Sequence, residues 1–159
     1  MRPEGGRALM LGVAAAALVA ACKASTSPHE PTPCPTYSGG LSADDSLYGL
    51  YHLVSYCLDT LPAYGPPADT GHVTLKKTTS ADSFVAVIVT AGQPPTTVSG
   101  TYTLPPPDSI HVTGQITTPL GPAPVELLGR FLLQHDLLSV SGRLSVSAQP
   151  LSLQGARLP

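Results

Sequence analysis

Charged residues, tryptophan and long hydrophobic runs are all scarce in this sequence of 159 residues. Charged side chains make up only 11% of the chain, with 8 Lys and Arg against 10 Asp and Glu, so no strongly basic surface is expected for nucleic acid. Tryptophan is absent and aromatic residues are 5% of the chain. The Gly-rich loops that cradle phosphate groups are also missing. Nucleic acid is therefore not expected as a partner.

The longest apolar run lies near the N-terminus and is too short for a helix that spans a membrane. Residues 8–21 are apolar and follow Arg2 and Arg7. A spanning helix needs about 20 apolar residues. A short positive segment followed by a run of this length is typical of a signal peptide, which we expect over residues 1–21.

The apolar run ends in Leu-Val-Ala-Ala-Cys (18–22), which resembles the lipobox of bacterial lipoproteins. In that family a peptidase cleaves before the cysteine, once its sulfur has received a diacylglyceryl group. The resemblance implies that Cys22 is lipidated and anchors the chain to a membrane of the bacterial cell envelope, and Lys23 after it favours the outer membrane. Each buried acyl methylene contributes about 0.8 kcal/mol to such an anchor. An ordinary secretory signal, and an uncleaved buried helix with an incidental cysteine, remain as alternatives.

Residues 22–45 are rich in Pro, Ser and Thr. Because they offer little apolar area to bury, we expect a disordered tether before a folded domain over residues 46–159. Cys34 lies in this tether and Cys57 in the domain, and an exported compartment permits their oxidation. We expect a Cys34–Cys57 disulfide, with two unpaired cysteines as the alternative. No Cys or His spacing indicates a zinc site.

After Asp45 the sequence consists of short β-prone runs separated by turns that are rich in Pro and Gly. Several runs alternate apolar and polar residues, which is typical of half-buried strands. Eight runs are expected, over residues 46–58, 72–78, 83–91, 96–104, 110–118, 125–134, 137–147 and 151–158. The run at 125–134 also fits a helical period, but Gly129 and the neighbouring runs favour a strand. We predict an all-β fold, an antiparallel up-and-down meander that forms a barrel or a sandwich.

The domain opens with YGLYHLVSYCLDTLP, which resembles the first strand of the bacterial lipocalin-like domain. The residues that match its Gly-x-Tyr-x-Leu-x-Ser and Leu-Pro pattern are Gly49, Tyr51, Leu53, Ser55, Leu61 and Pro62. Residues 98–113 and 137–146 are similar to later strands of that family. Larger lipocalins carry Trp where this chain has Tyr51, and an arginine of the closing strand packs across that ring. The resemblance implies a small barrel in which Arg157 lies over or beside Tyr51.

No catalytic or metal-binding arrangement is evident. The histidines lack the i, i+2 or i, i+4 spacing that preforms a metal site; they are His29, His52, His72, His111 and His135. His135-Asp136 could belong to a hydrolase triad, but no Gly-x-Ser-x-Gly motif accompanies it, and Asp is common in turns. We therefore expect neither enzymatic activity nor a cofactor or metal.

The expected function is non-enzymatic binding. The apolar rows of the strands mix Val, Ile and Leu with glycines, and a small barrel either is filled by side chains or holds one small ligand. We expect a narrow apolar site for a small hydrophobic ligand in a protein that Cys22 anchors to the envelope membrane. The alternative is a structural or protein-interaction module with a solid core, which would use an exposed apolar patch or an open edge between the first and last strands.

Overall fold

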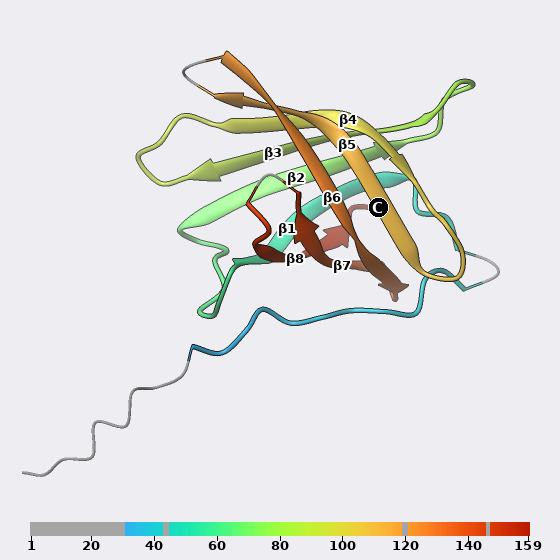
Figure 1. Ribbon diagram of the computed structural model, residues 1–159, viewed down its shortest axis with the longest axis horizontal. Coiled ribbons are helices and arrows are strands. Elements are labelled where there is room, and N and C mark those ends of the chain that lie inside the picture. Colours follow the sequence, from blue (N-terminus) through green and yellow to red (C-terminus); the bar gives the residue numbers. More distant parts are fainter. Residues whose placement is uncertain (1–30, 43–44, 119–120, 146) are drawn as a thin grey trace, which may run out of the picture. The chain divides into compact units, whose positions relative to one another are not determined.

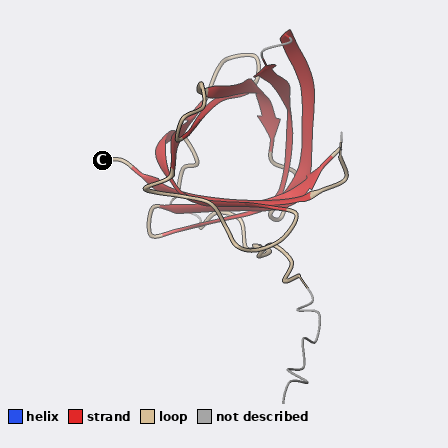
Figure 2. Cartoon of the chain, turned by 90° about the vertical axis from the view of Figure 1, so that its left-hand side faces the viewer, coloured by secondary structure: helices blue, strands red, loops and turns tan. Residues whose placement is uncertain are grey.

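The computed structural model describes residues 31–42, 45–118, 121–145 and 147–159, so the expected signal peptide, Cys22 and His29 lie outside the described residues. The strands are β1 (Gly49–Leu58), β2 (Asp69–Lys76), β3 (Asp82–Thr90), β4 (Thr96–Thr103), β5 (Ser109–Thr118), β6 (Gly121–Gln134), β7 (Leu137–Leu144) and β8 (Pro150–Arg157). Figure 1 shows their order, and Figure 2 shows them as a ring. No helix of sufficient length and apolarity to cross a bilayer occurs in this part of the chain.

Each strand pairs antiparallel with the next, and β8 pairs with β1, so the barrel is closed. The predicted all-β meander is confirmed, and each of the eight predicted runs corresponds to a strand. The run at 125–134 lies in a strand, as Gly129 indicated. Because the barrel is closed, β1 and β8 have no free edge between them. A protein-interaction module therefore could not bind its partner through that edge.

Two strands begin earlier than the sequence predicted. β2 starts at Asp69 and β6 at Gly121, both inside stretches that were expected to be turns. Pro122 and Pro124 of β6 pair with β5 alone, because pairing with β7 starts only at Leu127. Proline has no N–H to donate, and it is tolerated where a strand has a neighbour on one side.

Glycines face each other across two pairs of strands. Gly100 is opposite Gly114, and Gly129 is opposite Gly142. A Cβ atom on Gly100 would lie 2.1 Å from the Thr113 carbonyl oxygen and 2.5 Å from the Gly114 Cα atom. The backbones of β4 and β5 thus approach too closely for a side chain, and glycine allows the sheet to curve there.

The core is concentrated at one end of the barrel, which we call the packed end. Buried side chains there include Leu47, Tyr51, Tyr102, Leu133 and Leu138, from the segment before β1 and from β1, β4, β6 and β7. At the opposite end, which we call the loop end, inward apolar side chains such as those of Val98, Ile116 and Leu144 are only half-buried. The interior is therefore filled at one end and less densely packed toward the other.

Residues 31–42, which we call the docked segment, lie along the barrel (blue in Figure 1). The Gly40 N–H donates to the Phe131 carbonyl (2.9 Å), and the Leu133 N–H donates to the Gly40 carbonyl (3.0 Å). The Tyr37 N–H donates to Ser141 Oγ at 2.7 Å. This differs from the tether expected over residues 22–45, because backbone groups of the segment find partners on β6 and β7 even though it offers little apolar area.

The predicted disulfide between Cys34 and Cys57 is confirmed. It ties the docked segment to β1, and both cysteines are buried. The covalent link and the backbone hydrogen bonds together hold the segment in place.

Candidate functional site

The interior of the barrel contains a cavity of about 120 Å³. Its wall consists of side chains from β2 to β8, and the surface that they present to it is wholly apolar. They are Val73, Leu75, Phe84, Ala86, Tyr102, Ile110, Val112, Leu127, Leu138, Val140, Leu151 and Leu153. An engineered apolar cavity of about 150 Å³ stays dry and binds benzene or xenon. A cavity of this size and lining is therefore suited to a compact apolar ligand with few atoms.

The cavity follows from the sizes of the side chains that meet across neighbouring strands. Ala86 of β3 is opposite Val73 of β2 and Val98 of β4. The Ala86 side chain is much smaller than that of Phe84, two residues away on β3, so it leaves space between the two valines. The alternation of each strand turns these residues inward, and their small size leaves the space unfilled.

Tyr102 contributes its ring to the wall, and its hydroxyl presents no surface to the cavity. Its side chain is 2% exposed, and its hydroxyl has no hydrogen-bond partner among the described residues. Burial raises the pKa of the Tyr102 phenol, and the charge of Asp82, which is opposite Tyr102 in the sheet, raises it further. The phenol is therefore neutral at physiological pH. In that state it can both donate and accept a hydrogen bond.

Tyr51 and Arg157 close the packed end, from paired positions on β1 and β8. The Arg157 guanidinium carbon is 5.3 Å from the centre of the Tyr51 ring, and Arg157 Nη2 and Nε donate to the Tyr51 hydroxyl at 2.7 and 3.2 Å. That hydroxyl donates to the Leu47 carbonyl at 2.8 Å. Burial raises the pKa of the Tyr51 phenol, and Arg157 opposes the rise.

Gly49 and Tyr51 of the matched pattern thus come together with Arg157 at this end. A Cβ atom on Gly49 would lie 3.4 Å from Arg157 Nε, so Gly49 packs directly beside the guanidinium. Arg157 also donates to the Ser46 carbonyl and, at 3.3 Å, to the Asp136 carboxylate. The contact between Arg157 and Tyr51 that the resemblance implied is present, and it joins the first strand to the last.

The loop end carries a second unpaired polar atom. Asp69 is buried, and its Oδ1 atom has no hydrogen-bond partner in the described part of the chain. The rings of Tyr56 and Tyr64 stack nearby in the fold, with their centres 5.2 Å apart. Burial, and then the charge of Asp69, raises the pKa of the Tyr56 phenol. Neither Asp69 nor Tyr56 is among the residues that line the cavity.

The histidines form no metal site in the ranges that the structure describes. His52 and His72 are opposite each other on β1 and β2, and both are exposed. His111 Nε2 is 2.7 Å from Glu126 Oε1, and this hydrogen bond lowers the pKa of the Glu126 carboxyl. No group of three or more His, Cys, Asp or Glu side chains that could hold a metal ion occurs among the described residues.

His135 and Asp136 form the tight turn between β6 and β7. Both have positive φ angles, 50° and 63°, which is characteristic of two-residue hairpin turns. Asp136 accepts a hydrogen bond from Arg157 rather than from a histidine. The pair thus serves the turn and the packed end, as expected for Asp in a turn.

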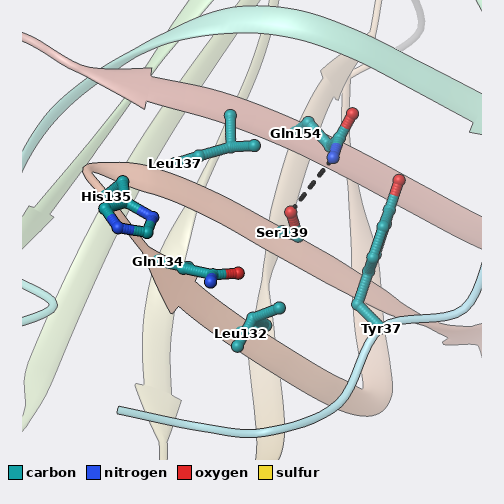
Figure 3. Close-up of a pocket in the computed structure, with 7 residues that line it drawn as sticks. All are labelled: Tyr37, Leu132, Gln134, His135, Leu137, Ser139 and Gln154. Atoms are coloured by element: carbon teal, nitrogen blue, oxygen red, sulfur yellow. Dashed lines mark hydrogen bonds between the residues drawn. The ribbon is translucent and has the colours of Figure 1, made fainter. Parts of the chain in front are cut away.

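A larger hollow of about 430 Å³ lies on the outside of the barrel, beside the docked segment (Figure 3). It is lined by Tyr37, Leu132, Gln134, His135, Leu137, Ser139 and Gln154. Gln154 Nε2 donates to Ser139 Oγ at 3.2 Å, and Gln134 and His135 are exposed. Water can satisfy those exposed polar groups. Sequence reasoning missed this hollow, since it exists only where the docked segment meets β6 to β8.

Comparisons with known proteins bear on the fold. No protein-family model and no curated protein matches this chain. A redesigned β-barrel is similar, with 14% identity over 71% of this chain and 92% of that chain and a TM-score of 0.55. A de novo designed fluorescence-activating β-barrel shows 13% identity over 70% of this chain and 93% of that chain, with a TM-score of 0.47. At such identities, the likeness to the redesigned barrel shows the β-barrel fold alone.

Proposed function

We propose that this protein is a lipid-anchored envelope protein whose barrel binds a small apolar ligand without catalysing a reaction. The observation that carries the proposal is the apolar cavity inside a closed barrel. Tyr51 and Arg157 close the packed end, and the less densely packed loop end offers the way in. A compact interior cavity with few polar groups is the usual form of a small-molecule site.

The size of the cavity sets the expected affinity. A ligand of about six non-hydrogen atoms, comparable to benzene, that gains about 1 kcal/mol per atom would bind with a free energy of about −6 kcal/mol. This corresponds to a dissociation constant of about 40 μM. Binding of this strength is measurable by titration, and it does not require any movement of the strands.

Thermal unfolding of the full chain carrying Cys22→Ser, which needs no detergent, tests ligand binding with benzene and cyclopentane as probes. A probe at 100 times its dissociation constant should stabilise the protein by about 2.7 kcal/mol. Ala86→Leu fills the cavity and should abolish the effect. Val85→Leu is the matched control, since Val85 is the neighbouring residue on β3 and its side chain is 41% exposed.

The result that contradicts ligand binding is a wild-type barrel with no saturable response to any probe. In that case Ala86→Leu should also destabilise the protein by about 1–3 kcal/mol, as overpacking of a filled core does. Such a solid core would favour the alternative, a structural or protein-interaction module. The pairing of β1 with β8 already removes the free strand edge that such a module would use.

The lipid anchor rests on the resemblance of residues 18–22 to a lipobox. Mass spectrometry of the exported protein should find Cys22 at the N-terminus with diacylglyceryl and acyl groups attached. Cys22→Ser should move the protein from the membrane fraction to the soluble fraction, because the acyl chains supply the anchoring free energy. An unmodified Cys22 in a freely released product would contradict the anchor and leave the ligand proposal untouched.

A further inference from the structure

We propose that Arg130 and Arg143 bind the phosphate groups of anionic lipids in the membrane that anchors the chain. This inference rests on the lipid anchor of the proposed function, and it concerns the outer wall of the barrel rather than its interior. It gives the anchored barrel a defined side, that of β6 and β7, which faces the bilayer.

The two arginines line one hollow on the outside of the barrel. This hollow, which we call the arginine hollow, has a volume of about 400 Å³ and lies between the docked segment and β6 to β8. Arg130 is opposite Ser141, and Arg143 is two residues further along β7, so the two side chains occupy diagonal positions on one face of the sheet. Diagonal neighbours lie roughly 7–8 Å apart, within reach of long side chains. Both guanidinium groups can therefore donate to one phosphate group.

Neither guanidinium is neutralised by a close ion pair. Arg143 is exposed and has no hydrogen-bond or ion-pair partner among the described residues. Arg130 Nη1 is 3.8 Å from Asp108 Oδ2, and the Arg130 side chain is 65% exposed. Glu126 lies two residues from the position opposite Arg143, and its carboxylate bonds to His111 at 2.7 Å. Both arginines thus keep donors for an anion that arrives from solvent.

The position of the arginine hollow favours a lipid as the source of that anion. Its wall includes Pro33 and Cys34, and the disulfide with Cys57 fixes this part of the docked segment to the barrel. Pro33 follows Cys22 by eleven residues. Because an extended chain spans at most about 3.6 Å per residue, a lipidated Cys22 keeps Pro33 within about 40 Å of the bilayer. The anchor therefore presents the hollow to lipid headgroups at a high effective concentration.

The overall charge of the barrel does not attract it to an anionic surface. Residues 31–159 contain five Lys and Arg against eight Asp and Glu. An anionic bilayer should therefore select the one side on which basic groups are gathered and open. Each Lys or Arg near such a bilayer strengthens binding by roughly fivefold, so the two arginines together should contribute about 30-fold.

The test couples the full chain through Cys22, its one cysteine outside the disulfide, to a maleimide lipid in nanodiscs. The discs contain phosphatidylcholine with or without phosphatidylglycerol, and a trace of a lipid that carries a gadolinium chelate on its headgroup. Paramagnetic broadening of the amide signals of residues 141–143, relative to those of β3 on the opposite side of the closed barrel, should be stronger in the anionic discs.

Two double variants assign this preference to the arginine hollow. Arg130→Gln with Arg143→Gln should lower the equilibrium constant for the bound orientation by about 30-fold and so remove the difference between the discs. Lys76→Gln with Lys77→Gln is the matched control, because it removes the same charge from two exposed residues elsewhere. The control should keep the difference.

Equal broadening in the two kinds of disc overturns the lipid site, as does a control variant that loses the preference to the same extent. The first comparison needs no substitution. Titration of the chain carrying Cys22→Ser with inorganic phosphate separates the two sources of the anion. Shifts of the Arg130 and Arg143 side-chain signals without any preference between the discs would show a site for free phosphate and overturn the lipid assignment.

Failure of this inference and failure of the proposed function are distinguishable. Because Cys22 is coupled chemically, the nanodisc results do not depend on lipidation in the cell. A negative result leaves the anchor and the interior ligand standing. An unmodified Cys22 in the exported protein would instead overturn the anchor itself.

Discussion

Tyr51→Phe tests how the packed end is held together. The substitution keeps the ring against Arg157 and removes only a hydroxyl that is fully buried. That hydroxyl donates to the Leu47 carbonyl at 2.8 Å and accepts from Arg157 Nη2 at 2.7 Å. The change therefore leaves a buried carbonyl without a donor and removes one acceptor from the guanidinium.

The two losses have different magnitudes. A buried acceptor left unpaired costs about 1–3 kcal/mol, and a hydrogen bond to a charged group contributes about 1.5–3 kcal/mol. The second loss is reduced, because Arg157 keeps its contacts with the Ser46 carbonyl and the Asp136 carboxylate. We expect Tyr51→Phe to lower the free energy of unfolding by about 3 kcal/mol, a large part of the 5–15 kcal/mol that is typical of a domain.

Urea unfolding of the two proteins measures this loss, and the denaturant dependence should stay the same. Tyr48→Phe is the matched control, because Tyr48 is half-buried and its hydroxyl bonds, among the described residues, only to the Asp82 carboxylate, at 3.3 and 3.5 Å. Although Asp82 is charged, both distances are long for an O–H···O bond and Tyr48 is only half-buried, so the substitution should cost less than about 1 kcal/mol. If Tyr51→Phe costs no more than Tyr48→Phe, the hydroxyl does not hold the packed end and the reasoning is refuted.

Replacing Cys34 and Cys57 by Ser should lower the free energy of unfolding by about 3.4 kcal/mol, the value that the chain-entropy relation gives for a separation of 23 residues. A loss below about 1 kcal/mol in denaturant unfolding would contradict this. Gly100→Ala should destabilise the barrel by about 1–3 kcal/mol in the same assay, because its Cβ atom would meet the Thr113 carbonyl oxygen. A gain of about 0.5–1 kcal/mol, the usual effect of Ala for Gly in a strand, would show that the close approach is not required. Because the pKa of Tyr102 is raised, its phenol stays protonated in the folded state at pH values above 10.0, where the phenol of the unfolded chain ionises. Tyr102 should therefore lower the free energy of unfolding by about 1.4 kcal/mol per pH unit above the ordinary pKa of 10.0. Below that pH this group adds no pH dependence, and a Tyr102→Phe variant with the same alkaline slope as wild type would contradict the assignment.

Local sequence patterns predicted most of the fold. Short β-prone runs, several of which alternate apolar and polar residues, predicted each of the eight strands, and the turns between them predicted an antiparallel meander. The boundaries at Asp69 and Gly121 were missed, because a strand can extend into Pro-rich or Gly-rich sequence wherever a neighbouring strand supplies partners. Pairing with the neighbour, rather than local propensity, decided those ends.

The position of the docked segment was likewise not predictable from its own sequence. Its composition indicated a disordered tether, and only the disulfide between Cys34 and Cys57 suggested that it would approach the barrel. Gly40 and Tyr37 are held by backbone and side-chain groups of β6 and β7, which lie about 90 to 100 residues later in the chain. Such partners have no signature in the segment itself.

The sequence by itself determined the number and order of the strands and which residues face inward, and its resemblance to lipocalin-like domains implied the contact between Tyr51 and Arg157. These properties depend on the two-residue period of a strand and on short motifs, both of which are local. Only the tertiary structure decided that Ala86 meets two valines beside a cavity, and that the Tyr102 hydroxyl is buried without a partner among the described residues. Volume and hydrogen-bond pairing depend on which side chains from several strands meet, and closure of the barrel sets those meetings.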